Sequence, residues 1–243
     1  AGFSAAGNVL AGLAVFLLVD PLGIRGVFVA GGLLAMAAAV PMFLYGRVSP
    51  SGERPSLNSR RIHLRRIHSL YYLLTFLDGA RRNIASIFIP FALVVIFHVD
   101  VKLITVLVTA NQLVSVFAAP QIGKLIERIG NRRSLIMDYS AAILIFLGFV
   151  LIQDRLLLFA LYLVNGVLFW GFSTALYAYA HGITDPDELP STLLTGQTVN
   201  HLSAFTVPAL CGLVWKIFGY HAAFLFGAVV AVLAVAVSSR TSR

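Results

Sequence analysis

Apolar runs of membrane length alternate with short polar gaps along most of this chain. A helix needs about 20 apolar residues to cross the roughly 30 Å hydrocarbon layer of a bilayer. Eight segments meet that length: 1–19, 26–45, 69–98, 103–122, 134–152, 156–180, 193–217 and 220–238. The pattern therefore predicts an all-α fold, a polytopic membrane helix bundle with eight visible spans.

The charges in the gaps between these runs predict which side of the membrane each gap occupies. Gap 46–68 carries six arginines against one glutamate, and gap 123–133 carries four basic residues. Lys and Arg in short loops stay in the cytoplasm, so we expect both gaps and both ends of the sequence to be cytoplasmic. Gap 181–192 has only acidic charges, which contribute little to orientation. The expected location is the plasma membrane, the inner membrane in a bacterium.

Composition excludes several other classes of protein. Charged residues make up 12% of the chain and hydrophobic residues 59%, whereas soluble domains carry roughly 25% charged residues. The net charge of +8 would suit nucleic acid, but topology and anionic headgroups explain basic residues that gather in short gaps. The single Cys211 lies in an apolar run, which argues against a disulfide framework or a cysteine-based metal site. No metalloprotease, hydrolase or phosphate-loop motif is present, so we expect no enzyme, metal or cofactor.

One internal similarity suggests a repeat. Gly23-Ile-Arg-Gly-Val-Phe28, with Gly31 and Ala35, recurs with identical spacing 196 residues later as Gly219-Tyr-His-Ala-Ala-Phe224, with Gly227 and Ala231. Small residues are common in membrane helices, so chance is the competing explanation. If the repeat is genuine, its period is six helices. The chain also begins abruptly inside an apolar run, so we expect four helices before Ala1 and a twelve-helix (6+6) arrangement of two parallel repeats.

The turn between the fourth and fifth apolar runs has the most specific pattern in the chain, Gly123-Lys-Leu-Ile-Glu-Arg-Ile-Gly-Asn-Arg-Arg-Ser-Leu135. It resembles the cytoplasmic signature loop of the major facilitator superfamily of transporters, with Glu127 where the family usually has Asp. The alternative is a basic turn that only sets topology in some other membrane protein. The resemblance implies that this loop locks neighbouring helix ends when the carrier faces outward. It implies a gating role for the matching residues Gly123, Glu127, Arg128, Gly130, Arg132 and Arg133.

The resemblance also implies a division of the chain. Residues 1–46 would be the last two helices of an N-terminal six-helix half, residues 47–68 a cytoplasmic linker, and residues 69–243 the complete C-terminal half. In such a half the signature loop joins the second and third helices, which is its position after the linker here.

The sharpest polar signal interrupts the apolar run 69–98 at Asp78-Gly-Ala-Arg-Arg-Asn83. The apolar stretch after it has 14 residues, about 21 Å of helix, which is too short to cross alone. The cluster must therefore lie at or within the inner half of the membrane. Asp78 and Arg82 are four residues apart and can pair. Charges at such depth usually mark a substrate or proton path. The alternative is that Arg81 and Arg82 reach the headgroups and anchor the helix.

A second polar group lies on one face of the run 193–217, where Gln197, Asn200 and His201 could meet polar substrate groups. His201 could titrate near neutral pH, while hydrogen bonding between helices is the structural alternative. Asp138 is expected to pair with the basic turn beside it. Three further residues are weaker candidates, for which helix packing competes with substrate contact: Asn111, Gln112 and Asn165.

These observations predict a secondary active transporter of a small solute, working by alternating access as a monomer in the lipid bilayer. Proton coupling, as a symporter or antiporter, would use Asp78 or His201, and the basic pair raises the possibility of an anionic substrate. The alternative is a non-transporting membrane scaffold or sensor with a transporter-like fold. Substrate identity does not follow from the sequence, because one fold serves many functions.

Overall fold

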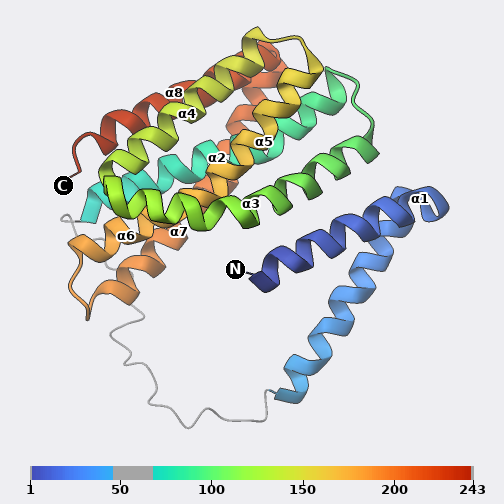
Figure 1. Cartoon of the computed structure of the whole chain (residues 1–243), viewed down its shortest axis with the longest axis horizontal. Helices are drawn as coiled ribbons and strands as arrows, with labels where there is room; N and C mark the ends of the chain where they lie inside the picture. The colour runs from blue at the N-terminus through green and yellow to red at the C-terminus, as the bar shows by residue number, and fades with distance from the viewer. Residues whose placement is uncertain (1, 46–67, 242–243) are drawn as a thin grey trace.

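The computed structural model describes residues 2–45 and 68–241 of the 243-residue chain (Figure 1). Its regular elements are all helices, as the sequence predicts: α1 (Gly2–Tyr45), α2 (Ser69–Val95), α3 (Val101–Ile129), α4 (Asn131–Leu151), α5 (Arg155–Gly171), α6 (Ser173–Ile183), α7 (Leu189–Phe218) and α8 (Tyr220–Ser238). The predicted linker 47–68 lies outside the described residues except for His68.

The predicted count of eight spans is wrong. Six helical stretches of the described chain are long and apolar enough to cross a membrane: Leu10–Pro41, Val101–Ile129, Asn131–Leu151, Arg155–Ile183, Leu189–Phe218 and Tyr220–Ser238. The predicted spans 1–19 and 26–45 form one element, α1, which is interrupted only at Gly23. Helix α2 falls outside the apolar set because Asp78, Arg81 and Arg82 occupy its middle. More than half of its 27 residues are buried, so most of the helix packs against other helices of the bundle.

Three glycines make the sharp junctions between helical segments. Gly23 (φ 65°, ψ 173°), Gly130 (φ 83°, ψ 159°) and Gly219 (φ 85°, ψ 176°) adopt a backbone conformation that is essentially reserved for glycine. Gly130 alone separates α3 from α4, and Gly219 alone separates α7 from α8. At Gly23 the chain of α1 turns sharply, so its two arms diverge in Figure 1. Gly23 and Gly219, which correspond in the internal similarity, thus share one backbone conformation.

Helix α2 lies at the centre of the bundle, against α7 and α8, while α4 packs along α8 and α3 packs against α5 and α1 (Figure 1). Aromatic rings fill the α4–α8 interface, where Phe149 and Phe224 stack with their centroids 5.2 Å apart. Gly227 lets these helices approach, since an added Cβ would lie 3.1 Å from the ring of Phe146. Helices α2 and α4 thus both pack against α8, and Arg81 of α2 reaches Asp138 of α4.

The outer surface of the described helices is strongly apolar. Phe28, Phe117 and Phe205 are 78%, 73% and 82% exposed. Such a surface suits a hydrocarbon solvent, in which each helix satisfies its own backbone hydrogen bonds.

Candidate functional site

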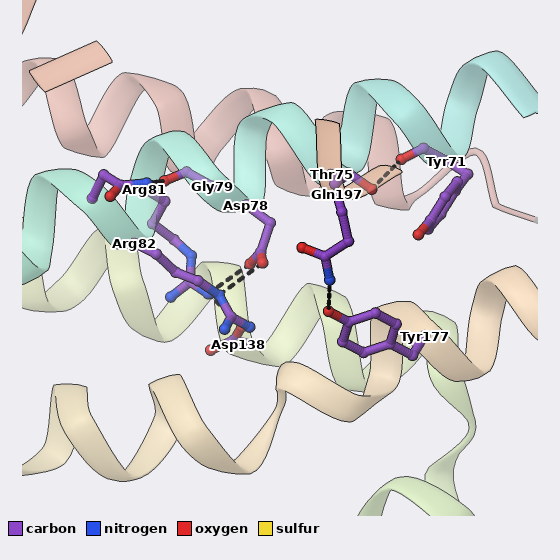
Figure 2. Close-up of polar contacts among 10 residues, drawn as sticks. Tyr71, Thr75, Asp78, Gly79, Arg81, Arg82, Asp138, Tyr177 and Gln197 are labelled. Atoms are coloured by element: carbon purple, nitrogen blue, oxygen red, sulfur yellow. Dashed lines mark hydrogen bonds and ion pairs between the residues drawn. The ribbon is translucent and has the colours of Figure 1, made fainter. Parts of the chain in front are cut away.

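Three ion pairs form one buried network in the middle of α2 (Figure 2). The Arg81 Nη2 group donates to Asp78 Oδ1 at 2.9 Å and to Asp138 Oδ2, on α4, at 2.8 Å. The Arg82 Nε atom lies 2.7 Å from Asp78 Oδ2. Two guanidinium groups thus face two carboxylates, and the formal charge of the network is zero.

The network lies inside the protein. The side chains of Asp78, Arg81 and Asp138 are 6%, 2% and 1% exposed, and that of Arg82 is 16% exposed. Isolated charges are too costly to bury, so mutual pairing is the condition for this arrangement.

Aromatic rings complete the surroundings of the two arginines. The guanidinium of Arg81 lies 5.2 Å from the ring centre of Tyr139, and that of Arg82 lies 4.8 Å from the ring centre of Phe169. Ring faces attract cations, most strongly where water is excluded. Both arginines therefore point into the bundle, and their carboxylate partners are buried with them.

The expectation that Asp138 pairs with the basic turn beside it is wrong. Asp138 is buried on the face of α4 that points toward α2, where the long side chain of Arg81 reaches it. The turn's own arginines, Arg128 and Arg133, are exposed. Solvated arginines at a helix end gain little from a carboxylate that would have to leave the interior, so Arg81 is the better partner.

A small pocket of about 50 Å³ lies beside the network and draws its lining from α2, α6 and α7. Its residues are Tyr71, Thr75, Asp78, Arg82, Leu176, Tyr177, Gly196, Gln197 and Asn200. One water occupies roughly 30 Å³ of liquid, so the pocket holds little more than water in this arrangement. Tyr177 and Gln197 are exposed, which places them where the pocket opens on the bundle surface.

The pocket wall is polar on the side that faces Asp78. The Gln197 Nε2 group donates to the Tyr177 hydroxyl at 2.6 Å, and these two side chains meet across the pocket in Figure 2. The Thr75 hydroxyl donates to the Tyr71 carbonyl oxygen at 2.8 Å. The pocket thus combines one ion pair with neutral hydrogen-bonding groups.

Two glycines bring α2 and α7 close enough to share this pocket. A Cβ atom at Gly79 would lie 2.9 Å from Asn200 Nδ2, and one at Gly196 would lie 2.5 Å from the Tyr71 hydroxyl oxygen. Small residues allow membrane helices this close an approach. Helix α6 supplies the third wall of the pocket through Tyr177. A break at Phe172 divides the predicted span 156–180 into α5 and α6.

The structure brings together four of the predicted pathway residues, since Asp78, Arg82, Gln197 and Asn200 all line the pocket. Arg81 lies behind Asp78 and does not line it. His201 is exposed on α7 and is also absent from the lining.

The remaining predicted pathway residues lie elsewhere. Asn111 is buried between α3 and α5, where its Nδ2 group donates to the Tyr162 carbonyl oxygen at 3.1 Å. Gln112 is half-buried on α3, and Asn165 is buried on α5. The structure thus places Asn111 in a helix interface.

Sequence reasoning missed Tyr71 and Tyr177 as pocket residues, and it misplaced Asp138. The two tyrosines gave no signal, because aromatic residues are common throughout the apolar runs. Asp138 could have been found by the criterion that found Asp78, since it too is an acid within an apolar run.

The signature loop occupies the last turns of α3, Gly130 and the first turn of α4. Glu127, Arg128 and Arg133 are exposed, Arg132 is half-buried, and none of them makes an ion pair within residues 2–45 and 68–241. A Cβ atom added at Gly123 would meet nothing within 4 Å. An open cleft of about 770 Å³ separates the loop from the end of α6. The gating contacts implied by the family resemblance stay a prediction.

The described part of the chain contains no group of three or more His, Cys, Asp or Glu side chains arranged to hold a metal ion.

The described chain is thus a polytopic helical bundle with a paired charge network beside a polar pocket. The family model of the Major Facilitator Superfamily matches residues 71–241, which run from the start of α2 past the end of α8. The chain belongs to this superfamily, and it is an integral membrane protein of the transporter class. A search of curated proteins found no match.

Proposed function

We propose that this protein is a secondary active transporter that moves a small solute by alternating access and couples that movement to protons at Asp78. The observation that carries the proposal is the position of the Asp78 carboxylate. It lines the pocket and at the same time pairs with Arg82 inside the bundle. A carboxylate that lines the pocket and also pairs with a buried arginine can link binding of the solute in the pocket to the protonation of the charge network.

Asp78 is a better candidate for the coupling site than Asp138 or His201, because it is the one of the three that lines the pocket. Asp138 is 1% exposed and does not line the pocket, so a proton has no direct route to it. His201 is exposed on α7 and does not line the pocket.

Protonation of Asp78 changes the electrostatic balance of the whole network. The network holds two negative and two positive groups, so one added proton leaves one positive charge without a partner. An unpaired charge in a water-poor interior is costly, so the bundle must rearrange or bind a compensating group. That requirement couples proton binding to a change of conformation or of occupancy.

The proposed halves keep the division drawn from the sequence. Residues 69–243 would form one wall of the transport path, with the pocket on its surface, and residues 1–46 would be helices of the opposite half. Helices α2, α3 and α7 contain internal prolines at Pro90, Pro120 and Pro208, where bending is easiest.

The proposal is tested by solute-driven proton movement in proteoliposomes that contain the full-length carrier and an internal pH-sensitive dye. A panel of neutral, cationic and anionic solutes is added, and we expect at least one to drive a proton flux. Asp78→Asn should abolish that flux, whereas His201→Ala and the exposed-loop control Asp187→Asn should retain it. An unchanged proton flux in Asp78→Asn, with the variant folded, would remove Asp78 from the mechanism.

A further inference from the structure

We infer that the substrate carries an anionic group, and that this group replaces Asp78 as the partner of Arg82 when a proton binds Asp78. The inference rests on the proposed function and adds to it the class of substrate and the ratio of charges moved. The charge of a small organic carboxylate or a comparable oxyanion matches that of Arg82, and the pocket of about 50 Å³ must widen to admit such a group. One proton accompanies each negative charge that enters.

The two arginines of the network differ in a way that selects Arg82 for this role. Arg81 is held by two carboxylates, Asp78 and Asp138, and lies away from the pocket. Arg82 lines the pocket and has Asp78 as its one carboxylate partner among the described residues. Loss of the Asp78 charge therefore leaves Arg81 paired and Arg82 unpaired, at the pocket wall.

The exchange can be written as a balanced step. A proton from the aqueous side forms an O–H bond with the Asp78 carboxylate, and the ion pair between Asp78 and Arg82 breaks. The N–H groups of Arg82 then donate to an oxygen of the incoming anion. Release reverses both events, and no other reactant is required.

Charge balance couples the binding of the proton to the binding of the anion. With both carboxylates ionised and the pocket empty, the network is neutral. With Asp78 protonated and one monoanion bound it is neutral again, whereas a proton alone or an anion alone leaves one charge uncompensated. Because uncompensated charge is costly in the membrane interior, the two neutral states are the ones that can reorient. Proton and anion are thus carried together.

Within residues 2–45 and 68–241, no carboxylate other than Asp78 is paired with Arg82. On α2, Asp78 pairs with Arg81 and Arg82, and α4 presents Asp138 and Tyr139. Tyr71 of α2 and Tyr177 of α6 line the same pocket. Helix α7 contributes only amides to the pocket, and α8 has no titratable residue after His221. Helix α5 presents the ring of Phe169 to Arg82. A proton on Asp78 therefore leaves Arg82 to be neutralised from the pocket.

The neutral part of the pocket suits the remainder of such a substrate. Hydroxyl groups of Tyr71 and Tyr177 and amides of Gln197 and Asn200 offer donors and acceptors around Arg82. Arginine presents N–H groups in a planar fork that matches a carboxylate, which a lysine does not.

The test is anion binding by the purified full-length carrier in detergent, followed by thermal unfolding. The probes are the sodium salts of acetate, lactate, succinate and benzoate at matched ionic strength, and the neutral controls are the corresponding amides. At neutral pH we expect Asp78→Asn to bind at least one anion about tenfold more tightly than the wild type does, because Arg82 is permanently available. The double variant Asp78→Asn/Arg82→Gln should lose that response. Wild-type protein should show the same gain on acidification, which keeps the test valid if Asp78→Asn does not fold.

The inference is overturned if amides stabilise the protein as well as the anions do, or if the double variant still responds to anions. It is also overturned if none of the four anions binds, in the variant or in acidified wild type. These outcomes are separable from failure of the proposed function. A neutral solute that drives proton movement through Asp78 would keep the coupled carrier and exclude the anion site.

Discussion

Arg81 on α2 donates a hydrogen bond to Asp138 on α4 at 2.8 Å, across 57 residues of sequence and in a part of the bundle closed to solvent. The bond holds one of the two arginines beside Asp78 in place from a second helix. It frees Asp78 to change its charge state without leaving Arg81 unpaired. In the proposed mechanism the network divides into a fixed part, Arg81 with Asp138, and an exchangeable part, Asp78 with Arg82.

This division predicts the effect of removing Asp138. The substitution Asp138→Leu leaves one uncompensated positive charge inside the protein, and breaking a buried pair in this way costs about 3–5 kcal/mol. We expect a clearly lower midpoint of thermal unfolding in detergent. The double variant Arg81→Met/Asp138→Leu removes one charge of each sign and should recover most of the loss. If the double variant lost as much stability as Arg81→Met and Asp138→Leu lose in total when made separately, the pair would not act as a unit.

A second prediction concerns the α3–α5 interface. An added Cβ at Gly166 would overlap the side-chain amide of Asn111, which donates to the Tyr162 carbonyl oxygen. Gly166→Ala should therefore destabilise the bundle by roughly 1–3 kcal/mol, the usual cost of overpacking. The companion change Asn111→Ala should relieve part of that loss, because it removes the overlapping atoms. Gly182→Ala is the matched control, since its added Cβ meets nothing within 4 Å. Equal effects of Gly166→Ala and Gly182→Ala on thermal unfolding would contradict this account of Asn111.

A third prediction concerns the turn between α3 and α4. Gly130 has φ 83° and ψ 159°, a conformation that costs a residue with a side chain about 1–3 kcal/mol. Gly130→Ala should lower the unfolding midpoint although no neighbouring atom lies within 4 Å of the added Cβ. Gly123→Ala, in the same loop but with a helical backbone and similar open space, should have a much smaller effect. If the two substitutions had the same effect, the backbone of Gly130 would not be under this constraint.

The sequence predicted best those features that depend on a single physical requirement, such as the length of an apolar run or the spacing of residues along a helix. Membrane-length apolar runs predict helices with little ambiguity, and the signature turn at Gly123–Leu135 led to the correct superfamily. The pairing of Asp78 with Arg82 also followed from helical spacing alone. Span counting failed at α2, whose charges are tolerated only because other helices bury them, and tertiary burial is not visible in a linear pattern.

Other features depended on three-dimensional packing. Asp138 looked like a partner of the nearby basic turn because proximity in sequence was the only guide, whereas its actual partner is 57 residues away. His201 shares a helical face with Gln197 and Asn200 in the sequence pattern. In the structure the pocket includes Gln197 and Asn200 but not His201. Tyr177 is placed by the break between α5 and α6, for which the apolar run 156–180 gave no signal.

The most direct measurement compares net uptake with exchange, in proteoliposomes that contain the full-length carrier or its Asp78→Asn variant. Once a transported anion is known, net uptake driven by a pH gradient should be lost in Asp78→Asn, because the empty variant keeps an uncompensated charge on Arg82 and cannot return. Exchange of labelled for unlabelled anion should persist, because the loaded variant is neutral. Net, gradient-driven accumulation by Asp78→Asn at the wild-type level would contradict the account.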